Sequence, residues 1–482
     1  MGGCIKTSEL GRNKKYVTPE ERKKKSVTTK DLELEAHVRS MYKPPETRYL
    51  HEIMPSGIWK GRRCFIIGGG PSLRGFDFSQ LKGELVITVN RGLESFPDSI
   101  LNLCQDARLW GWWECGDLGA EAKKKFDEYP GQKVWLDVQR FPYPEDIRII
   151  RTCHRSDFNF KSYANGIPPW GNSGLNALCL ASCLGADPIY LLGFDCKGEN
   201  GRTANHHSGY PDSHQEGVYK SFIRDFNEAA PDLRKVARVV NLNPASSIRC
   251  FDFGRIEDVK RISRPIYVSY YTKGTGYQVE IERLHTSLHR WGLEHEFVGI
   301  DDLGSWRANI HARISVLREL LDRLKRDIVY IDADGAVIHY PDLLDTVDAD
   351  FAAVWLDREK YFPDIWKKSF YNESPGGKWE ILGGTMFFRN NDKARAMLDA
   401  WEKLDAPMAT HLSQVHLFNA IKAVPEIRTA KLPDGYCQIF DIMAMAGEPI
   451  IEHYQASRRS LCRVKIDGGK FGLDEIKKEK DA

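Results

Sequence analysis

The sequence predicts an α/β fold made of two domains. At roughly 150 residues per domain, a chain of 482 residues is too long for a single one. Hydrophobic residues make up 42% of the chain and charged residues 28%, the balance of a globular protein able to bury a core. In two separate stretches, short apolar runs alternate with segments of helical periodicity. This alternation predicts parallel sheets whose faces are covered by helices.

The first stretch supplies three apolar runs of strand length and one helix. Residues 64–67 and 85–89 are continuous apolar runs that end in glycine or asparagine, which predicts buried strands. Residues 174–184 have the length and composition of a helix, and residues 189–192 form the next strand. Such an order is typical of a parallel sheet.

The second stretch starts after about residue 262 and repeats the pattern. A strand over 266–271 precedes a helix whose apolar residues recur at a spacing of four, three, four and three, which places them on one helical face. A strand over 296–298, a second helix over 310–324 and a strand over 328–331 follow. The unit is strand, helix, strand, helix, strand. The apolar positions of the first helix are Tyr277, Ile281, Leu284, Leu288 and Trp291.

The boundary between the two stretches lies near residues 255–264. We therefore predict a first domain over residues 46–258 and a second over residues 264–468. Residues 1–45 are predicted to form a basic, flexible tail, and residues 469–482 a charged tail.

The charge balance excludes some partners. The chain has 69 Lys and Arg residues against 67 Asp and Glu residues, a formal net charge of +2. This excludes a surface that binds polyanions all over, but it leaves room for a local basic patch. The tail carries two basic runs, Lys14-Lys15 and Arg22-Lys23-Lys24-Lys25. Such runs usually lie solvated, and contact with a nucleic acid or an acidic partner is the alternative.

Nothing in the composition predicts a membrane protein. No apolar run approaches the roughly 20 residues that span a bilayer, and residues 1–7 lack the apolar stretch of a signal peptide. Eleven cysteines without a Cys-x-x-Cys pair favour reduced thiols. We expect a cytoplasmic protein with no membrane span.

A pair of carboxylates follows the last strand of the second stretch. Asp332 and Asp334 are two residues apart, and in extended backbone such side chains point to the same side. Two oxygen ligands on one side suit Mn²⁺ or Mg²⁺, and a metal that keeps water ligands can bridge a diphosphate. The carboxyl end of a strand in an α/β sheet is also where ligands usually bind. The alternative is a solvated turn before Gly335.

Four motifs of this half occur in the order seen in one enzyme class. The second half resembles the GT-A class of nucleotide-sugar-dependent glycosyltransferases, and the resemblance spans about residues 264–465. It implies a nucleotide-sugar donor, a glycan or polymer acceptor, and Mn²⁺ or Mg²⁺ as cofactor. The motifs are Thr272-Lys273-Gly274, Tyr330-Ile331-Asp332-Ala333-Asp334, Leu382-Gly383-Gly384-Thr385-Met386-Phe387-Phe388 and Ile451-Glu452-His453-Tyr454-Gln455-Ala456-Ser457-Arg458.

The same resemblance implies roles for single residues. Asp332, Asp334 and His453 would hold the metal, and the two aspartates would also serve catalysis. A late histidine of this kind is commoner in retaining groups, so retention is the expected stereochemistry. For Gly383-Gly384-Thr385 the alternative is a tight bend before a strand over 386–388. The expected donor-binding residues of this half are Thr272, Lys273, Gly274, Arg313, Gly383, Gly384 and Arg458, with Arg459 as the alternative to Arg458.

The first half has a glycine-rich loop after its first strand. The loop is Gly68-Gly69-Gly70-Pro71-Ser72, and its backbone N–H groups could hold an anion. It lacks the third glycine of the dinucleotide-binding fingerprint and the lysine of a Walker A loop. A tight turn is the alternative.

Four stretches of this half together resemble a known group. They are similar to the Rossmann-like group of bacterial sialyltransferases and motility-associated glycosyltransferases, which also includes an archaeal pterin pyrophosphokinase. The resemblance implies that the glycine-rich loop and Asn90 hold a nucleotide, with Asp195 beside them, and that Ser173-Gly174 at a helix start bind phosphate. The stretches are residues 65–73, Val89-Asn90-Arg91, Gly171-Asn172-Ser173-Gly174 and residues 185–195.

The loop over residues 197–216 carries His206, His207 and His214 among small polar residues. Three readings remain open. The histidines could bind a metal, although cysteine and carboxylate companions at tight spacing are missing. The loop could be a lid over the nucleotide with one histidine, His214, as acid or base. It could also be a solvated loop.

The combined hypothesis is a two-domain glycosyltransferase, metal-dependent in its second domain. The first domain would be a second transferase or a nucleotide-binding module; in the alternatives it is non-catalytic or transfers pyrophosphate. A further alternative is a viral-type enzyme that glycosylates a hydroxymethylated DNA base. The basic tail and three tryptophans able to stack on a base motivate it, although core packing is the preferred role for those rings. The tryptophans are Trp110, Trp112 and Trp113.

Overall fold

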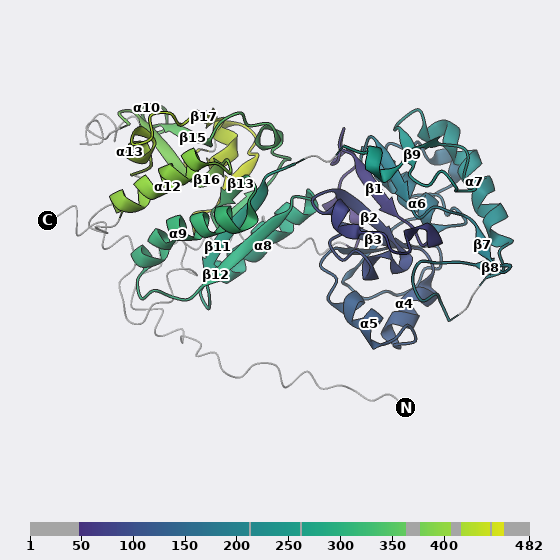
Figure 1. The fold of residues 1–482 in the computed structure, drawn as a ribbon. Helices are drawn as coiled ribbons and strands as arrows, with labels where there is room; N and C mark the ends of the chain where they lie inside the picture. Colours follow the sequence, from purple (N-terminus) through teal and green to yellow (C-terminus); the bar gives the residue numbers. More distant parts are fainter. Residues whose placement is uncertain are drawn as a thin grey trace.

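The computed structural model describes residues 48–211, 214–260, 263–362, 376–405, 416–443 and 446–456. The described residues form two lobes that lie side by side, each built around its own sheet (Figure 1). The α/β class predicted from the sequence is confirmed. Among the described residues, no helix combines the length and the apolar character that crossing a membrane requires.

The first lobe contains an eight-stranded sheet in the order β10-β9-β6-β1-β2-β3-β4-β5, and every pairing in it is parallel. All residues of β1, β2 and β3 are buried, as expected for central parallel strands covered on both faces. A separate hairpin, β7–β8, follows β6. The strands are β1 Cys64–Ile67, β2 Leu85–Val89, β3 Leu101–Cys104, β4 Gln132–Leu136, β5 Ile147–Ile150, β6 Ile189–Leu192, β7 Gly198–Glu199, β8 Arg202–Thr203, β9 Val239–Asn241 and β10 Asp252–Phe253.

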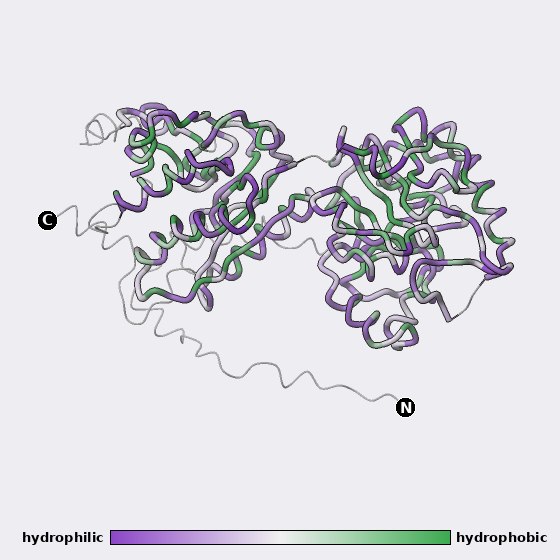
Figure 2. The backbone as a smooth tube through the Cα atoms, in the orientation of Figure 1, coloured by the Kyte–Doolittle hydropathy of each residue, from purple (hydrophilic) through white to green (hydrophobic). Residues whose placement is uncertain are grey.

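Helix α6 is the central helix of this lobe. It contacts β1, β2, β3 and β6, and its residues are almost all buried, so its apolar composition follows from its place in the core. Figure 2 shows the hydrophobic segments gathered inside the lobe and the hydrophilic ones outside. The α-helices of the lobe are α3 Leu50–Ile53, α4 Ala107–Glu114, α5 Ala120–Asp127, α6 Ser173–Cys183 and α7 Val218–Leu233.

The second lobe contains a six-stranded sheet in the order β12-β11-β13-β16-β15-β17. The first three strands are parallel, as the strand–helix pattern predicts. β16 runs antiparallel to both β13 and β15, so the sheet is mixed rather than fully parallel. The strands are β11 Ile266–Thr272, β12 His295–Ile300, β13 Ile328–Ile331, β15 Phe351–Asp357, β16 Trp379–Phe388 and β17 Thr429–Leu432; the α-helices are α8 Tyr277–Arg290, α9 Trp306–Leu324, α10 Arg358–Tyr361, α12 Asp392–Asp405 and α13 Leu417–Lys422.

Strand β16 has an irregularity at its glycines. Ala353 of β15 pairs with Met386, whereas Trp355 pairs with Ile381, so β16 uses more residues than β15 over the same length. This is a bulge, which displaces the backbone locally. The alternative of a tight bend before a strand at residue 386 is therefore wrong, because Gly383 and Gly384 lie inside a strand that already begins at Trp379.

A small three-stranded sheet, β14-β19-β18, lies beside the large one. Its strands are β14 Gly335–Val337, β18 Gln438–Ile439 and β19 Ile451–His453. β14 and β19 are antiparallel, and Gly335 lies opposite His453. The pairing brings the end of the described chain to the residues that follow β13.

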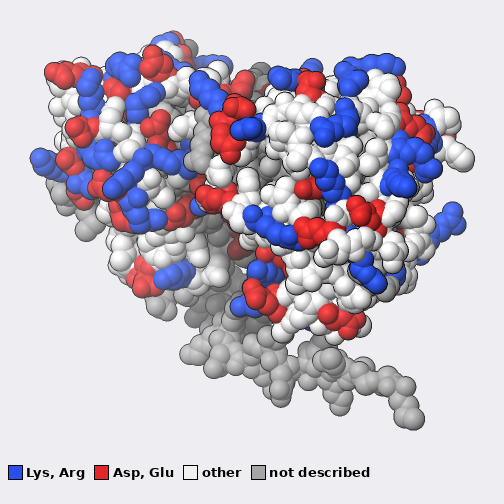
Figure 3. All heavy atoms as spheres, turned by 45° about the vertical axis from the view of Figure 1, so that its right-hand side comes forward, with Lys and Arg blue, Asp and Glu red and all other residues white. Residues whose placement is uncertain are grey.

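Buried ionic contacts join the two lobes. Glu84, just before β2, accepts a hydrogen bond from Arg63 at 2.9 Å and lies 3.5 Å from Arg264, which precedes β11. Arg264 in turn lies 3.4 Å from Asp345 of the second lobe. On the surface, by contrast, Figure 3 shows charges of both signs interspersed over the face in view, in keeping with the net charge of +2.

Replacement of Glu84 with alanine is expected to lower the free energy of unfolding by about 3 kcal/mol, because it removes the buried carboxylate that pairs with two largely buried arginines. The Arg63 and Arg264 side chains are 11% and 13% exposed. The matched control is Lys82→Ala, since Lys82 pairs with Glu294 at 3.5 Å but is 61% exposed; its change is expected to stay below about 1 kcal/mol. Denaturant titration of both variants measures the difference, and equal losses would contradict the expectation.

Candidate functional site

Three side chains with metal-binding groups meet in the second lobe. One ligand atom each from Asp332, Asp334 and His453 lies within 4.8 Å of the others. The aspartates follow β13, and the histidine is the last residue of β19. The Nδ1 atom of His453 lies 3.8 Å from an Asp334 carboxylate oxygen. The β14–β19 pairing thus joins residues that are far apart in the sequence.

Hydrogen bonds fix both carboxylates. Asp334 Oδ2 accepts from the backbone N–H of Ala456 at 2.6 Å. Asp332 Oδ1 accepts from the Tyr330 hydroxyl at 2.5 Å. The orientation of both carboxylates is therefore set by Tyr330 of β13 and by the segment that follows β19.

The donor set fits a divalent first-row metal. Asp334 is 8% exposed and His453 is 2% exposed, and buried carboxylates need a compensating cation. Two carboxylates and an imidazole form a mixed oxygen and nitrogen set, which such a metal accepts more readily than Mg²⁺ does. Burial lowers the pKa of His453, but Cys437 and Asp334 raise it, and its pKa lies well above the usual value. The site therefore attracts positive charge.

Arg313, on α9, lies beside this cluster. Its guanidinium donates to the Gly383 carbonyl oxygen at 2.9 Å and lies 4.0 Å from Asp332 Oδ1. Burial lowers the pKa of Arg313, but the Asp332 carboxylate raises it, and the net shift is upward. The backbone N–H of Asp332 donates to Gly384 O at 2.8 Å. Arg313 and the bulge of β16 therefore hold the backbone around the carboxylates.

The predicted donor-binding residues at the first strand lie at the same edge of the sheet. β11 and β13 are parallel neighbours. Thr272, the last residue of β11, therefore lies at the same sheet edge as the aspartates that follow β13. Lys273 is exposed and pairs with Asp301 at 3.2 Å. Gly274 has a positive φ of 67°, which favours glycine. Arg458 and Arg459 lie outside the described residues.

The first lobe contains a cavity of about 290 Å³. It opens at the carboxyl ends of β1, β2, β3 and β6 and at the start of α6, the usual ligand position in a parallel sheet. Most of the residues predicted for a nucleotide line it, whereas Pro71 and Ser72 do not. The predicted residues in the wall are Gly68, Gly69, Gly70, Asn90, Ser173, Gly174, Asp195 and His214.

One carboxylate in this wall serves the glycine-rich loop. Asp195 is buried and accepts from the Ser72 hydroxyl at 2.7 Å and from its backbone N–H at 3.2 Å. The loop is thereby held against the end of β6. Gly70 packs so closely here that a side chain would overlap the Asp195 carboxylate and lie 2.5 Å from Gly193 O. Asp195 lines the cavity, whereas Ser72 supports it from outside the lining.

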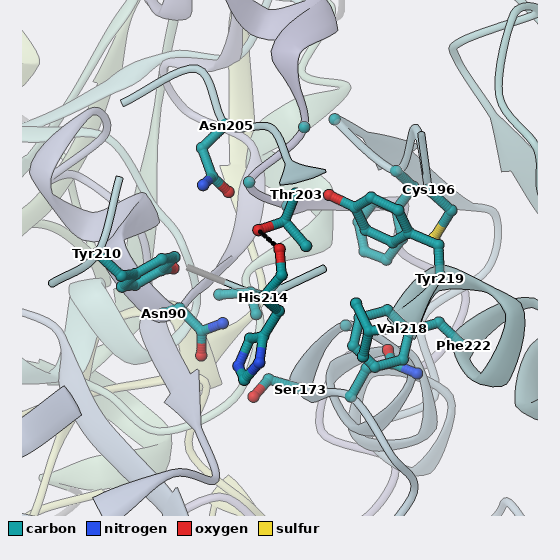
Figure 4. A pocket seen from close by; sticks show the side chains of 18 of the residues that line it. Asn90, Ser173, Cys196, Thr203, Asn205, Tyr210, His214, Val218, Tyr219 and Phe222 are labelled. Carbon is teal, nitrogen blue, oxygen red and sulfur yellow. Dashed lines mark hydrogen bonds between the residues drawn. The ribbon is translucent and has the colours of Figure 1, made fainter. Parts of the chain in front are cut away.

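The pocket has a polar side and an aromatic side. Helix α6 begins at the polar side, where Asn172 caps it by accepting from the Leu175 N–H at 2.7 Å. The Nδ2 atom of the buried Asn172 has no hydrogen-bond partner in the described protein. A helix N-terminus favours an anion. Tyr219 and Phe222 of α7 lie across His214 from Asn90 and Tyr210 (Figure 4).

His214 enters the pocket from the loop before α7. Figure 4 shows its imidazole extending towards Asn90 and Ser173. Asn90 has a positive φ of 54°, a conformation that asparagine tolerates better than most residues and that is often found at functional sites. An imidazole, an amide and a hydroxyl therefore share one wall.

The other two loop histidines are packed rather than solvated. The backbone N–H of His206 donates to Gly69 O at 3.0 Å, and its ring lies 3.0 Å from the Ser95 hydroxyl. Burial lowers the pKa of His207 to about 3, so this ring stays neutral. Within the described ranges, Asp332, Asp334 and His453 are the one group placed to hold a metal. The described structure therefore does not support a metal site formed by His206, His207 and His214.

Some pocket residues carry no motif and were not predicted. Arg108 of α4 and the aromatic residues Tyr219 and Phe222 of α7 line the cavity. The Arg108 guanidinium is paired with Asp106, at 2.7 Å. Their sequence signal is weak, because aromatic residues on one helix face look the same whether they cover a core or a ligand.

Comparisons with known proteins add little at the level of sequence. No protein-family model matches the chain. No curated protein matches it either.

Solved glycosyltransferases align with parts of this chain at low similarity. A glycosyltransferase involved in the glycosylation of the major capsid of PBCV-1 aligns over 45% of this chain and 100% of its own, at 12% identity and a TM-score of 0.30. The galactosyltransferase LgtC, in complex with donor and acceptor sugar analogs, aligns over 44% of this chain and 94% of its own, at 10% identity and a TM-score of 0.29. GlyE of Streptococcus pneumoniae TIGR4 aligns over 40% of this chain and 54% of its own, at 15% identity and a TM-score of 0.27, so about half of GlyE is covered. Scores this low carry no conclusion about this chain.

Replacement of Gly70 with alanine is expected to destabilise the first lobe by about 1–3 kcal/mol, because the added methyl group overpacks the loop against Asp195. Gly111 of α4 is the matched control, since a Cβ there meets no atom within 4 Å; Gly111→Ala should be neutral or stabilise by up to about 1 kcal/mol. Thermal unfolding of both variants measures the difference. A Gly70→Ala protein as stable as the wild type would contradict the close packing.

Proposed function

We propose that the chain is a metal-dependent glycosyltransferase that takes a nucleotide-sugar donor in its second lobe and transfers the sugar to a glycan or polymer. The observation that carries the proposal is the convergence of Asp332, Asp334 and His453 at the carboxyl edge of the sheet. Motifs that resemble the GT-A class supply these three residues. Ligands of α/β sheets bind at this edge.

The proposal follows from the chemistry of the bond that breaks. Cleavage of a sugar–phosphate bond leaves negative charge on the diphosphate, and groups that stabilise this charge lower the barrier. Asp332, Asp334 and His453 would hold Mn²⁺ or Mg²⁺, and the mixed donor set favours Mn²⁺. The bound metal supplies Lewis-acid stabilisation of the leaving diphosphate.

The chain's own residues orient this site. Tyr330 and Arg313 both contact the Oδ1 atom of Asp332. The backbone of Gly383 and Gly384 is proposed to approach the sugar, and the acceptor hydroxyl must be positioned close to the anomeric carbon. Lys273 is an exposed cation at the edge where the donor is proposed to bind. Retention is the stereochemistry we propose, because the metal shell includes a late histidine.

For the first lobe we propose a nucleotide site that acts as a second transferase or as a binding module. The glycine-rich loop and the start of α6 would hold phosphate, and the aromatic side would face the base. In the transferase version His214 is the acid or base, since it extends into the pocket. Of the tryptophans that motivated DNA modification, Trp113 is buried and stacks on Phe126, whereas Trp112 lines the cavity of the first lobe. The basic tail lies outside the described residues.

Replacement of Asp334 with alanine is expected to lower the metal-dependent transfer rate at least about 100-fold, because a bound metal contributes several kcal/mol to the transition state. The readout is transfer of label from a panel of UDP-, GDP- and CMP-sugars with Mn²⁺. Asp348→Ala is the control, since Asp348 is 85% exposed and pairs with Arg428 at the surface. If no donor is turned over by the wild type, or if Asp334→Ala equals it, the proposal is wrong.

A second experiment separates the two versions of the first lobe. If the first lobe is a transferase, part of the transfer activity should survive Asp334→Ala. His214→Ala should lower that remaining activity by about 10²–10⁴-fold, the usual contribution of general acid–base catalysis. Nucleotide affinity should stay within about threefold of the wild type, because His214 acts on the reaction rather than on binding. Calorimetric titration and product assays on the full chain measure the two effects, with His154→Ala, an exposed histidine, as control. Nucleotide binding without any such transfer would favour the binding module.

A further inference from the structure

The buried face of His453 contacts one hydroxyl group. The Oγ1 atom of Thr385, in β16, lies 2.9 Å from Nε2 of the imidazole. Thr385 is 0% exposed and His453 is 2% exposed, so this contact is shielded from water. The other ring nitrogen, Nδ1, faces Asp334 at 3.8 Å. The two nitrogens therefore point to different partners, a hydroxyl on one side and the proposed metal ligands on the other.

Metal binding by Nδ1 decides where the ring proton must be. A neutral imidazole carries one proton, and the nitrogen that binds a metal cannot carry it. The proton then resides on Nε2 and needs an acceptor, because a buried N–H without a partner is costly. Thr385 Oγ1 is placed to accept it. Hydrogen bonds of this kind fix the orientation of metal-binding histidines and raise their basicity.

Two glycines leave space for the imidazole ring of His453. A Cβ at Gly384 would lie 2.9 Å from Cε1 of His453, and a Cβ at Gly335 would lie 3.2 Å from the same atom. The first distance is shorter than real Cβ contacts, so a side chain there would displace the ring. Gly384 immediately precedes Thr385, so the bulge of β16 both clears space for the imidazole and presents the hydroxyl to it.

We propose that Thr385 is a positioning residue for the metal site: its hydroxyl accepts the Nε2 proton of His453 and thereby keeps Nδ1 available to the metal. The inference rests on the metal site of the proposed function and adds a residue that acts on the metal only through His453. The metal that it serves is a divalent first-row ion, for which Mn²⁺ is the probe.

The test compares Mn²⁺ affinity in full-length variants by electron paramagnetic resonance of the free ion. Thr385→Val keeps the shape and removes the hydroxyl, and it should weaken binding about 10- to 100-fold, the usual effect of losing such a hydrogen bond. Thr385→Ser keeps the hydroxyl and should stay within about threefold of the wild type. If the valine variant does not fold, the pair Thr385→Ser and Thr385→Ala differs by the hydroxyl alone and should show the same ordering.

A double-mutant cycle separates positioning from general packing. In a His453→Ala background, Thr385→Val should have no further effect on Mn²⁺ affinity, because the hydroxyl acts through the imidazole. Equal affinity of the wild type and Thr385→Val, or an equal loss in Thr385→Ser and Thr385→Ala, would overturn the inference.

The same measurements distinguish failure of the inference from failure of the proposed function. A wild-type chain that binds no Mn²⁺ would remove the metal site and the role of Thr385 together. Mn²⁺ binding with the predicted ordering of variants, but no transfer from any donor, would leave the role of Thr385 standing and overturn the glycosyltransferase proposal alone.

Discussion

The pairing of β14 with β19 is the interaction on which the second lobe's site depends. It sets Gly335 opposite His453 and so brings an imidazole from the end of the described chain to the aspartates that follow β13. Gly335 has little room for a side chain, since a Cβ would lie 2.5 Å from the Ile331 side chain. Backbone ladders specify register, and a slip of one residue would turn His453 to the opposite face. Without this pairing the two aspartates would form no more than an acidic turn.

A second constraint is that key polar groups near each site are held by other parts of the fold. Asp334 accepts from the Ala456 N–H, and Arg313 reaches from α9 to Gly383 O. The first lobe uses the same principle, because buried Asp195 secures Ser72 of the glycine-rich loop. Buried polar groups are stable only with partners. These contacts therefore make both sites rigid.

Strand and helix positions were largely predictable because buried parallel strands are continuous apolar runs. The structure has strands at Cys64–Ile67, Leu85–Val89 and Ile189–Leu192, and each coincides with such a run. The glycines of β16 are an exception. Gly383 and Gly384 favour a bend locally, but they lie inside a strand that is paired on both sides. Tertiary pairing overrides local preference there. Likewise, the packing of His206 depends on contacts with Gly69 and Ser95, which the local sequence does not reveal.

The sequence by itself determined the α/β class, the two strand-rich halves and the candidate ligands at strand ends, because these follow from local periodicity and from the position of polar residues after apolar runs. Only the tertiary structure decided which candidates meet. It brings His453 to Asp334, sets Thr385 against the far side of that ring, and turns Ser72 away from the cavity that Gly68 and Asn90 line. The physical reason is that such contacts join strands distant in the chain, and their geometry is set by register, bulges and burial rather than by neighbouring residues.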